Sequence, residues 1–310
     1  TSESLRDPLL REYSSPVAWV EFSHSNGRGR AALTSFLLGA TLALVPVMIL
    51  LVPSALPFCV YFALLICFHM SEYLLTAAFR PDTLSFDNFL LNHSTSYQAM
   101  IALCWVEYWA ELLLLDRLVA PGWKQWGLLS TLGLIACLVG LCTRALGMAT
   151  ASTNFSHRIE ERKRQARQFP RSARRRLGPL AVASFPARPH APLILFSPII
   201  DSLRAPPAPP TASPTAFLIW QEHRLVTHGI YSYLRHPAYF GFFWWSVGTQ
   251  LLLVNPLCLV AYTGATFYFF YDRIPYEESL LVRFFGDQYL QFRRRTWIGI
   301  PGMAWAVGSS

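Results

Sequence analysis

Polar residues crowd one short stretch of this 310-residue chain, directly before an apolar and aromatic segment. The stretch covers residues 223–241 and ends in the run RHPAYFG at 235–241. The rings of His236 and Tyr239 offer flat faces and hydrogen-bonding groups. A proline at a helix start leaves the N–H groups of the first turn available to a ligand. The stretch therefore predicts a ligand-binding turn at the start of an apolar helix.

A second group of charged residues lies farther along the chain. Arg273 and Glu277 are four residues apart, with Pro275 between them. A guanidinium binds a carboxylate through two parallel hydrogen bonds, so Arg273 is suited to hold an anionic substrate. Glu277 is suited to a cationic group of a cofactor. On a helix the pair would instead form an ordinary ion pair of roughly a few tenths of a kcal/mol, but Pro275 argues against an uninterrupted helix here.

The elements that must position these residues are predicted to cross a membrane. Hydrophobic residues make up 53% of the chain and charged residues 14%, whereas roughly a quarter of a soluble domain is charged. No glycine-rich Rossmann turn follows a strand. We therefore expect an all-α integral membrane protein with about six transmembrane helices and no Rossmann domain. The predicted spans are 31–52, 56–79, 97–118 and 126–149, followed by a helical hairpin of 240–254 and 257–271.

The positive charges predict an orientation for these spans. Lys and Arg concentrate in alternate connections, which typically face the cytosol. The predicted cytosolic segments are 1–30, 80–96, 150–236 and 272–310, and the opposite side holds 53–56, 119–125 and 255–256, with Lys124 as its main charge. Both termini and both polar groups are therefore expected on the cytosolic side.

One basic segment invites a nucleic-acid interpretation, which the sequence does not favour. Residues 158–176 contain nine Lys or Arg and two acids, with Phe169 as the one aromatic residue that could stack on a base. Such a run typically lies in solvent or faces anionic lipid. The six cysteines form no metal-ligand spacing, so neither a metal site nor a disulfide framework is expected.

Three blocks carry a resemblance to a known family. They are 68–77 with 84–94, 152–157, and 223–289. Together they resemble the isoprenylcysteine carboxyl methyltransferases over roughly residues 31–160 and 220–301. The resemblance implies S-adenosylmethionine-dependent methyl esterification of the C-terminal prenylcysteine carboxylate of CaaX-processed proteins. It also implies a multi-pass protein of the endoplasmic reticulum membrane whose C-terminal catalytic region faces the cytosol, with in-line transfer and no metal. It implies nothing about oligomeric state.

The resemblance also assigns roles to individual residues. Arg273 would hold the substrate carboxylate, and Arg235 is a second candidate for steering that anion. Glu277 would serve the cofactor. Glu160 occupies a position where the family commonly has Gln. The residues expected to contact the cofactor are Glu160, His223, Arg224, Leu225, Val226, Tyr231, His236, Pro237, Ala238, Tyr239 and Glu277.

Domain boundaries follow from composition and the resemblance together. Residues 161–219 are rich in Pro, Ala, Ser and Arg and are expected to be a mostly disordered insertion. The remaining regions are an N-terminal tail (1–30), a transmembrane region with the start of the cofactor site (31–160), a catalytic region (220–301) with a helical hairpin and, after Glu278, an amphipathic helix, and a C-terminal tail (302–310).

Three acidic residues fall within the apolar spans, where a charge is costly and usually faces protein or water. They are Glu72, Glu107 and Glu111. Glu107 and Glu111 share a helix face and could pair with Arg144 or line the path of the prenyl chain.

Two other functions remain open. A phospholipid N-methyltransferase also carries a run like RHPxY, but it would need a base to deprotonate its amine, and blocks 68–77 and 84–94 would be unexplained. A membrane scaffold without activity is the non-enzymatic alternative, because 161–219 separates two parts of one predicted cofactor site.

Overall fold

The computed structural model describes residues 28–92, 94–115, 121–152 and 225–303. The regular structure of these residues is helical, and strand pairing among them is confined to an isolated parallel bridge between Leu234 and Trp297. The chain divides into two compact units. The first unit contains 1–153 and 236–267, and the second contains 154–235 and 268–310. The helical class predicted from the sequence is confirmed, while the insertion at 161–219 lies outside the described residues.

Three helical segments of the described chain are long and apolar enough to cross a membrane, all in the first unit. One comprises α3 (Arg28–Ala43) and α4 (Val45–Leu51), and the next comprises η1 (Pro53–Ala55) and α5 (Leu56–Phe79). The last is α8 (Leu128–Ala151). Their outer faces carry exposed apolar side chains, such as Leu50 and Leu128, which suits contact with lipid tails. They correspond to three of the six spans predicted from the sequence.

An aromatic core joins α5 to α6 (Thr95–Ala110), which continues as the π-helical turn η4 (Glu111–Leu115). The ring of Phe58 lies 5.7 Å from that of Trp105 and 5.2 Å from that of Tyr108. Two short 3-10 turns, η2 (Pro81–Thr83) and η3 (Phe86–Phe89), connect the helices, and the Ser94 hydroxyl caps α6 by accepting from the Tyr97 N–H. A helix therefore covers most of the third predicted span, 97–118, whose last residues, 116–118, are not described.

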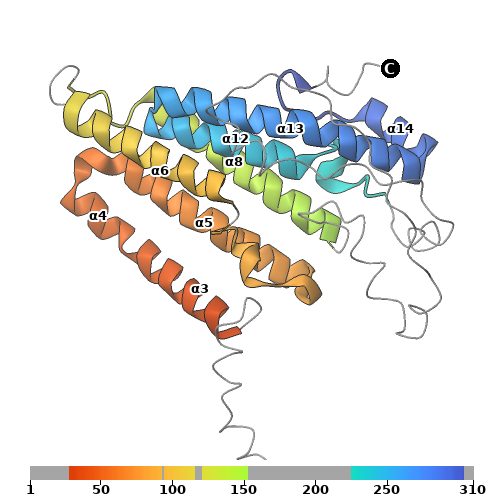
Figure 1. Cartoon of the computed structure of the whole chain (residues 1–310), viewed down its shortest axis with the longest axis horizontal. Coiled ribbons are helices and arrows are strands. Elements are labelled where there is room, and N and C mark those ends of the chain that lie inside the picture. The colour runs from red at the N-terminus through yellow and green to blue at the C-terminus, as the bar shows by residue number, and fades with distance from the viewer. Residues whose placement is uncertain (1–27, 93, 116–120, 153–224, 304–310) are drawn as a thin grey trace, which may run out of the picture. The chain divides into compact units, whose positions relative to one another are not determined.

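The closest helix packing in the first unit joins α8 to α12 (Pro237–Leu253), which lie side by side (Figure 1). Glycines make this approach possible. A Cβ atom on Gly140 would lie 2.6 Å from the Gly241 carbonyl oxygen, and one on Gly133 would lie 2.7 Å from the Gly248 carbonyl oxygen. Both are closer than a Cβ can come, so small residues set the distance between these helices, as in other membrane proteins.

The hairpin partner of α12 is longer than the sequence predicted. Helix α13 runs from Pro256 to Phe285 without a break at Pro275, so the prediction of an interruption there was wrong. Proline removes one helical donor, but the surrounding protein can hold the helix together when neighbouring positions are well packed. Ile274 and Glu278, on either side of Pro275, are both almost fully buried.

The second unit contains the rest of α13, the short η6 turn (Gly229–Ser232) and α14 (Asp287–Arg295). The amphipathic helix predicted after Glu278 is not a single element, because the chain breaks at Gly286, which has a φ of 52°. This left-handed conformation is easy for glycine and costly for other residues. The first half of the predicted helix therefore belongs to α13 and the second half is α14.

Candidate active site

In the first unit, the predicted ligand-binding turn forms the start of α12. Pro237 occupies the first helical turn and His236 is the N-cap residue, as the sequence indicated. His236, Pro237 and Ala238 are buried, and Tyr239 is partly buried. The His236 and Tyr239 rings stack with centroids 5.4 Å apart and planes 12° apart. The sequence thus predicted the local structure of this turn correctly.

A buried ion pair supports the same turn from α5 and α8. The Arg144 Nη2 donates to Glu72 Oε2 at 2.9 Å, and Nε donates to Glu72 Oε1. Arg144 Nη1 also donates to the Ala238 carbonyl at 3.0 Å. A cation beside a helix N-terminus is opposed by the helix dipole, so the Glu72 carboxylate is needed to neutralise it. From the sequence, Glu107 or Glu111 was a possible partner of Arg144, whereas its partner in the structure is Glu72.

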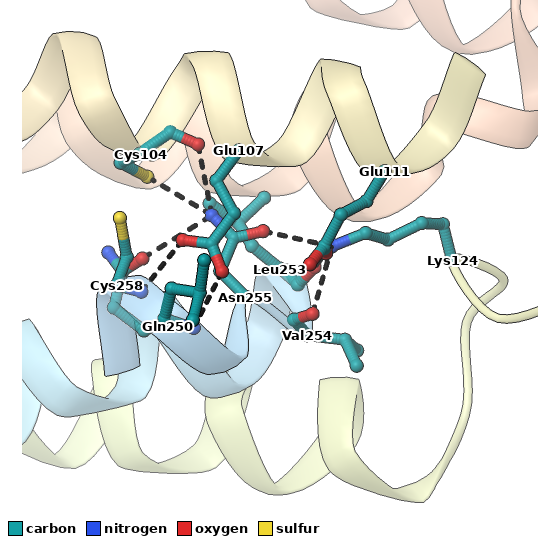
Figure 2. Close-up of polar contacts among 10 residues, drawn as sticks. Cys104, Glu107, Glu111, Lys124, Gln250, Leu253, Val254, Asn255 and Cys258 are labelled. Carbon is teal, nitrogen blue, oxygen red and sulfur yellow. Dashed lines mark hydrogen bonds and ion pairs between the residues drawn. The ribbon is translucent and has the colours of Figure 1, made fainter. Parts of the chain in front are cut away.

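Glu107 and Glu111 serve the turn between α12 and α13 instead (Figure 2). Glu107 accepts hydrogen bonds from the N–H groups of Leu257 and Cys258, both at 2.7 Å. Glu111 pairs with Lys124 at 2.5 Å. Both carboxylates therefore have structural roles at this turn. Of the two roles that the sequence left open, pairing and lining the path of the prenyl chain, this is the first, but the partners are not Arg144.

Lys124 reaches into this turn and is itself fully buried. Its ammonium donates to the Leu253 and Val254 carbonyls at 3.0 and 2.8 Å and to Asn255 Oδ1 at 2.9 Å. Burial lowers the pKa of Lys124, and the bond to Glu111 opposes that shift. Val254 has a φ of 53°, a strained conformation for a β-branched residue. The ammonium and its acceptors hold the strained turn in place.

In the second unit, the structure brings together two of the predicted cofactor residues. Burial raises the pKa of the Tyr231 phenol, and the negative charge of Glu277 raises it further. The phenol therefore stays protonated at neutral pH, within electrostatic range of that carboxylate. Leu225 and Val226 are partly buried in the same unit.

Arg273 and Glu277 both lie on α13 in this unit, one helical turn apart. Both side chains are partly buried. The Arg273 guanidinium carbon lies 5.6 Å from the centroid of the Phe269 ring, an arrangement that stabilises a cation through the face of the ring. Because α13 is continuous, the two charges project from one face, where an anion and a cation can be held about one turn apart.

Arg235 has several partners within the second unit. Its Nε donates to Glu278 Oε1 at 2.6 Å, and its Nη1 donates to the Thr296 carbonyl at 2.5 Å and to the Arg293 carbonyl at 3.5 Å. The remaining predicted residues, Glu160, His223 and Arg224, lie outside the described residues.

Comparison with known proteins identifies the family. Residues 214–283 match the model of the isoprenylcysteine carboxyl methyltransferase family, a segment that includes every predicted site residue except Glu160. The protein-S-isoprenylcysteine O-methyltransferases of Xenopus laevis and Homo sapiens are 36% and 33% identical over 79% and 78% of this chain, and the chain spans 64% and 63% of their length. The Dictyostelium discoideum protein of the same name is 31% identical, with 79% of this chain and 78% of the relative covered.

A solved structure is similar as well. It is that of a eukaryotic intramembrane Ras methyltransferase, an isoprenylcysteine carboxyl methyltransferase, with 32% sequence identity and a TM-score of 0.60 over 86% of this chain and 75% of that one. The family resemblance that the sequence motifs suggested is thereby confirmed. This chain is a helical membrane protein that belongs to the isoprenylcysteine carboxyl methyltransferase family.

Proposed function

We propose that this chain esterifies the C-terminal carboxylate of prenylcysteine on CaaX-processed proteins, with S-adenosylmethionine as the methyl donor. The observation that carries the proposal is the arrangement on α13, where Arg273 and Glu277 share a helix face within the segment that matches the family. One charge suits the anionic substrate and the other suits a cationic donor.

The substrate carboxylate needs no base, because its pKa is about 3.5 and it is already an anion at neutral pH. It needs a cation that fixes it in line with the methyl group and removes it from water. In the proposal Arg273 supplies that cation through a bidentate contact. No proton then has to move before the new ester bond forms.

The residues present fit S-adenosylmethionine, which when bound supplies an activated methyl group on a sulfonium. The stacked rings of His236 and Tyr239 offer a flat face suited to an adenine or a cation. The carboxylate of Glu277 suits a cationic group of the donor, and the protonated Tyr231 phenol can donate a hydrogen bond. Pro237 opens α12 and has no N–H, so the first backbone donor of this helix start is the Ala238 N–H. The proposed contacts also include Glu160, His223, Arg224, Leu225 and Val226.

Residence in the endoplasmic reticulum membrane, with a cytosolic active site, completes the proposal. A prenyl chain favours an enzyme within lipid, and prenylated proteins would meet it from the cytosol. The charge distribution supports this orientation. Lys124, the main positive charge assigned to the opposite side, is buried against Glu111. The other proposed spans are α6, α12 and the first part of α13, which would bring the total to six.

The proposed division of the chain keeps 31–160 as the transmembrane region and 220–301 as the catalytic region, with the insertion 161–219 between them and tails at 1–30 and 302–310. The proposed chemistry needs no metal. Substrate proteins and membrane lipid are the proposed partners.

The choice of substrate tests this function most simply. Membranes containing the chain would receive labelled S-adenosylmethionine together with either N-acetyl-S-farnesylcysteine or phosphatidylethanolamine. We expect a base-labile methyl ester on the farnesylcysteine and no label on the lipid. Label that resists base and remains with the lipid would identify a phospholipid N-methyltransferase, and no transfer to either substrate by correctly inserted protein would favour a scaffold.

A further inference from the structure

A buried ion network in the second unit surrounds Arg235. Its Nε bonds to Glu278 at 2.6 Å, and the side chains of the two residues are 9% and 2% exposed. Arg293 Nε approaches the second oxygen of Glu278 at 3.4 Å. A single carboxylate on α13 therefore lies between guanidinium groups from two other segments, the loop before His236 and helix α14.

Backbone pairing ties the same segments together. The Arg235 N–H donates to the Trp297 carbonyl at 3.0 Å, and the Trp297 N–H donates to the Tyr233 carbonyl at 2.9 Å. Arg235 Nη1 adds a bond to the Thr296 carbonyl at 2.5 Å. The segment that follows α14 thus pairs with the loop that leads into the family motif, through main chain and side chain together.

The network lies next to two predicted site residues along the chain. Arg235 immediately precedes His236, and Glu278 immediately follows Glu277. Helix α14 contributes Tyr289 and Phe292, which are buried at 1% and 5% exposure. Burial raises the pKa of the Tyr289 phenol, and the charge of Glu278 adds to that effect, so this phenol stays neutral beside the network.

These contacts distinguish Arg235 from Arg273. Two of the three guanidinium nitrogens of Arg235 are engaged by protein oxygens, and the Glu278 carboxylate balances its charge. A bidentate grip on a substrate carboxylate needs a pair of N–H groups directed at the substrate. Arg273 lies on α13 with its cation over the Phe269 ring.

We propose that Arg235 is a positioning residue rather than a group that touches the substrate, and that the Arg235–Glu278–Arg293 network makes Arg293 and the backbone of Thr296 and Trp297 part of the structure that positions the site. The network fixes the loop before His236 and, at the same time, the position of the α13 turn that carries Glu277. This inference rests on the proposed function and replaces the anion-steering role suggested for Arg235.

The test distinguishes a residue that binds the substrate carboxylate from a residue that only positions other parts of the site. For each variant, kcat and KM would be measured with N-acetyl-S-farnesylcysteine, together with the inhibition constant of the corresponding farnesylcysteine amide. A residue that grips the carboxylate sets the preference for acid over amide, whereas a positioning residue does not. We expect Arg235→Lys and Glu278→Gln to lower kcat roughly 10- to 100-fold, as small misplacements do, with the acid preference unchanged. Arg273→Lys should reduce that preference.

Arg294→Gln is the matched control, because Arg294 neighbours Arg293 on α14 and is exposed. It should leave kcat unchanged. Hydrogen exchange provides a readout that does not depend on activity: the amides of Arg235 and Trp297 should lose protection in Glu278→Gln and keep it in Arg294→Gln. If Arg235→Lys fails to fold, Arg293→Gln, which removes the longer 3.4 Å contact, should give the same pattern.

Three results would overturn the inference. They are a loss of acid preference in Arg235→Lys, wild-type kcat in the network variants that fold, and unchanged exchange at both amides in Glu278→Gln. A wild-type chain that forms no ester would instead refute the proposed function.

Discussion

At the level of single residues, the proposed reaction depends on which charge serves which reactant. Arg273 and Glu277 occupy successive turns of one helix, and the Glu277 charge influences Tyr231. If Glu277 serves the methyl donor and Arg273 serves the substrate, their substitutions must affect different kinetic constants. That separation can be measured.

Glu277→Gln should raise the KM for S-adenosylmethionine roughly 10-fold or more, since a hydrogen bond to a charged group typically contributes about 1.5–3 kcal/mol. The KM for farnesylcysteine should change little. Steady-state methylation at varied donor concentration measures both constants. Asp287→Asn, an exposed carboxylate on α14, is the control, and a change confined to the farnesylcysteine KM would reverse the assignment.

At the scale of elements, the contact between α8 and α12 positions the turn that contains His236 and Tyr239. Gly140 and Gly241 let the two backbones approach, and the Glu72–Arg144 pair binds the first turn of α12. Two substitutions test these two features separately.

Gly140→Ala should destabilise the protein by about 1–3 kcal/mol, as overpacking in tight interiors does, because its Cβ would collide with the Gly241 carbonyl. Thermal unfolding in lipid nanodiscs would measure this as a lower Tm. Gly264→Ala is the matched control: it is also helical, and nothing lies within 4 Å of its added Cβ. Equal effects at both positions would show that helix packing is not the cause.

Glu72→Gln should destabilise the protein by about 3–5 kcal/mol, since it leaves the buried Arg144 cation without its counter-charge. The double variant Glu72→Gln/Arg144→Met removes both charges and should recover part of the lost stability. Unfolding of the wild type, Glu72→Gln, Arg144→Met and the double variant forms a double-mutant cycle. Additive losses would mean that the two side chains do not depend on each other.

The elements also show what a sequence can and cannot reveal. The bounds of α5 and the start of α12 at Pro237 follow from apolar length and proline chemistry, both of which are local. The continuity of α13 through Pro275 depends on the packing of Ile274 and Glu278, which no local pattern reports. The evenly spaced glycines 133, 140 and 147 were a readable sign of close helix packing that the sequence interpretation missed.

Ion-pair partners are the part that sequence reasoning predicted worst. Glu72, Glu107 and Glu111 were recognised as costly charges within apolar spans, but their partners were not predicted. Which face of each helix meets which neighbour is a tertiary property. The local structure around His236 and Tyr239 was easier to predict, because the motif fixes the spacing of these residues around the helix start.

At the scale of the whole molecule, the proposed orientation predicts which loops face the cytosol. In sealed vesicles of endoplasmic reticulum with the cytosolic face outward, an impermeant maleimide should label Ser232→Cys directly. It should label Gln125→Cys only after detergent is added, because that residue lies in the opposite connection. Both native side chains are exposed, and labelling of the wild-type cysteines is subtracted. The reverse pattern would invert the orientation.

The most direct measurement of the central claim is methyl transfer from labelled S-adenosylmethionine to N-acetyl-S-farnesylcysteine by the wild type, Arg273→Ala and Arg283→Ala. Arg283 lies on the same helix but is exposed. The account predicts base-labile ester from the wild type and Arg283→Ala, and loss of ester from Arg273→Ala in protein that remains folded. Ester formation at the wild-type rate by Arg273→Ala would contradict it.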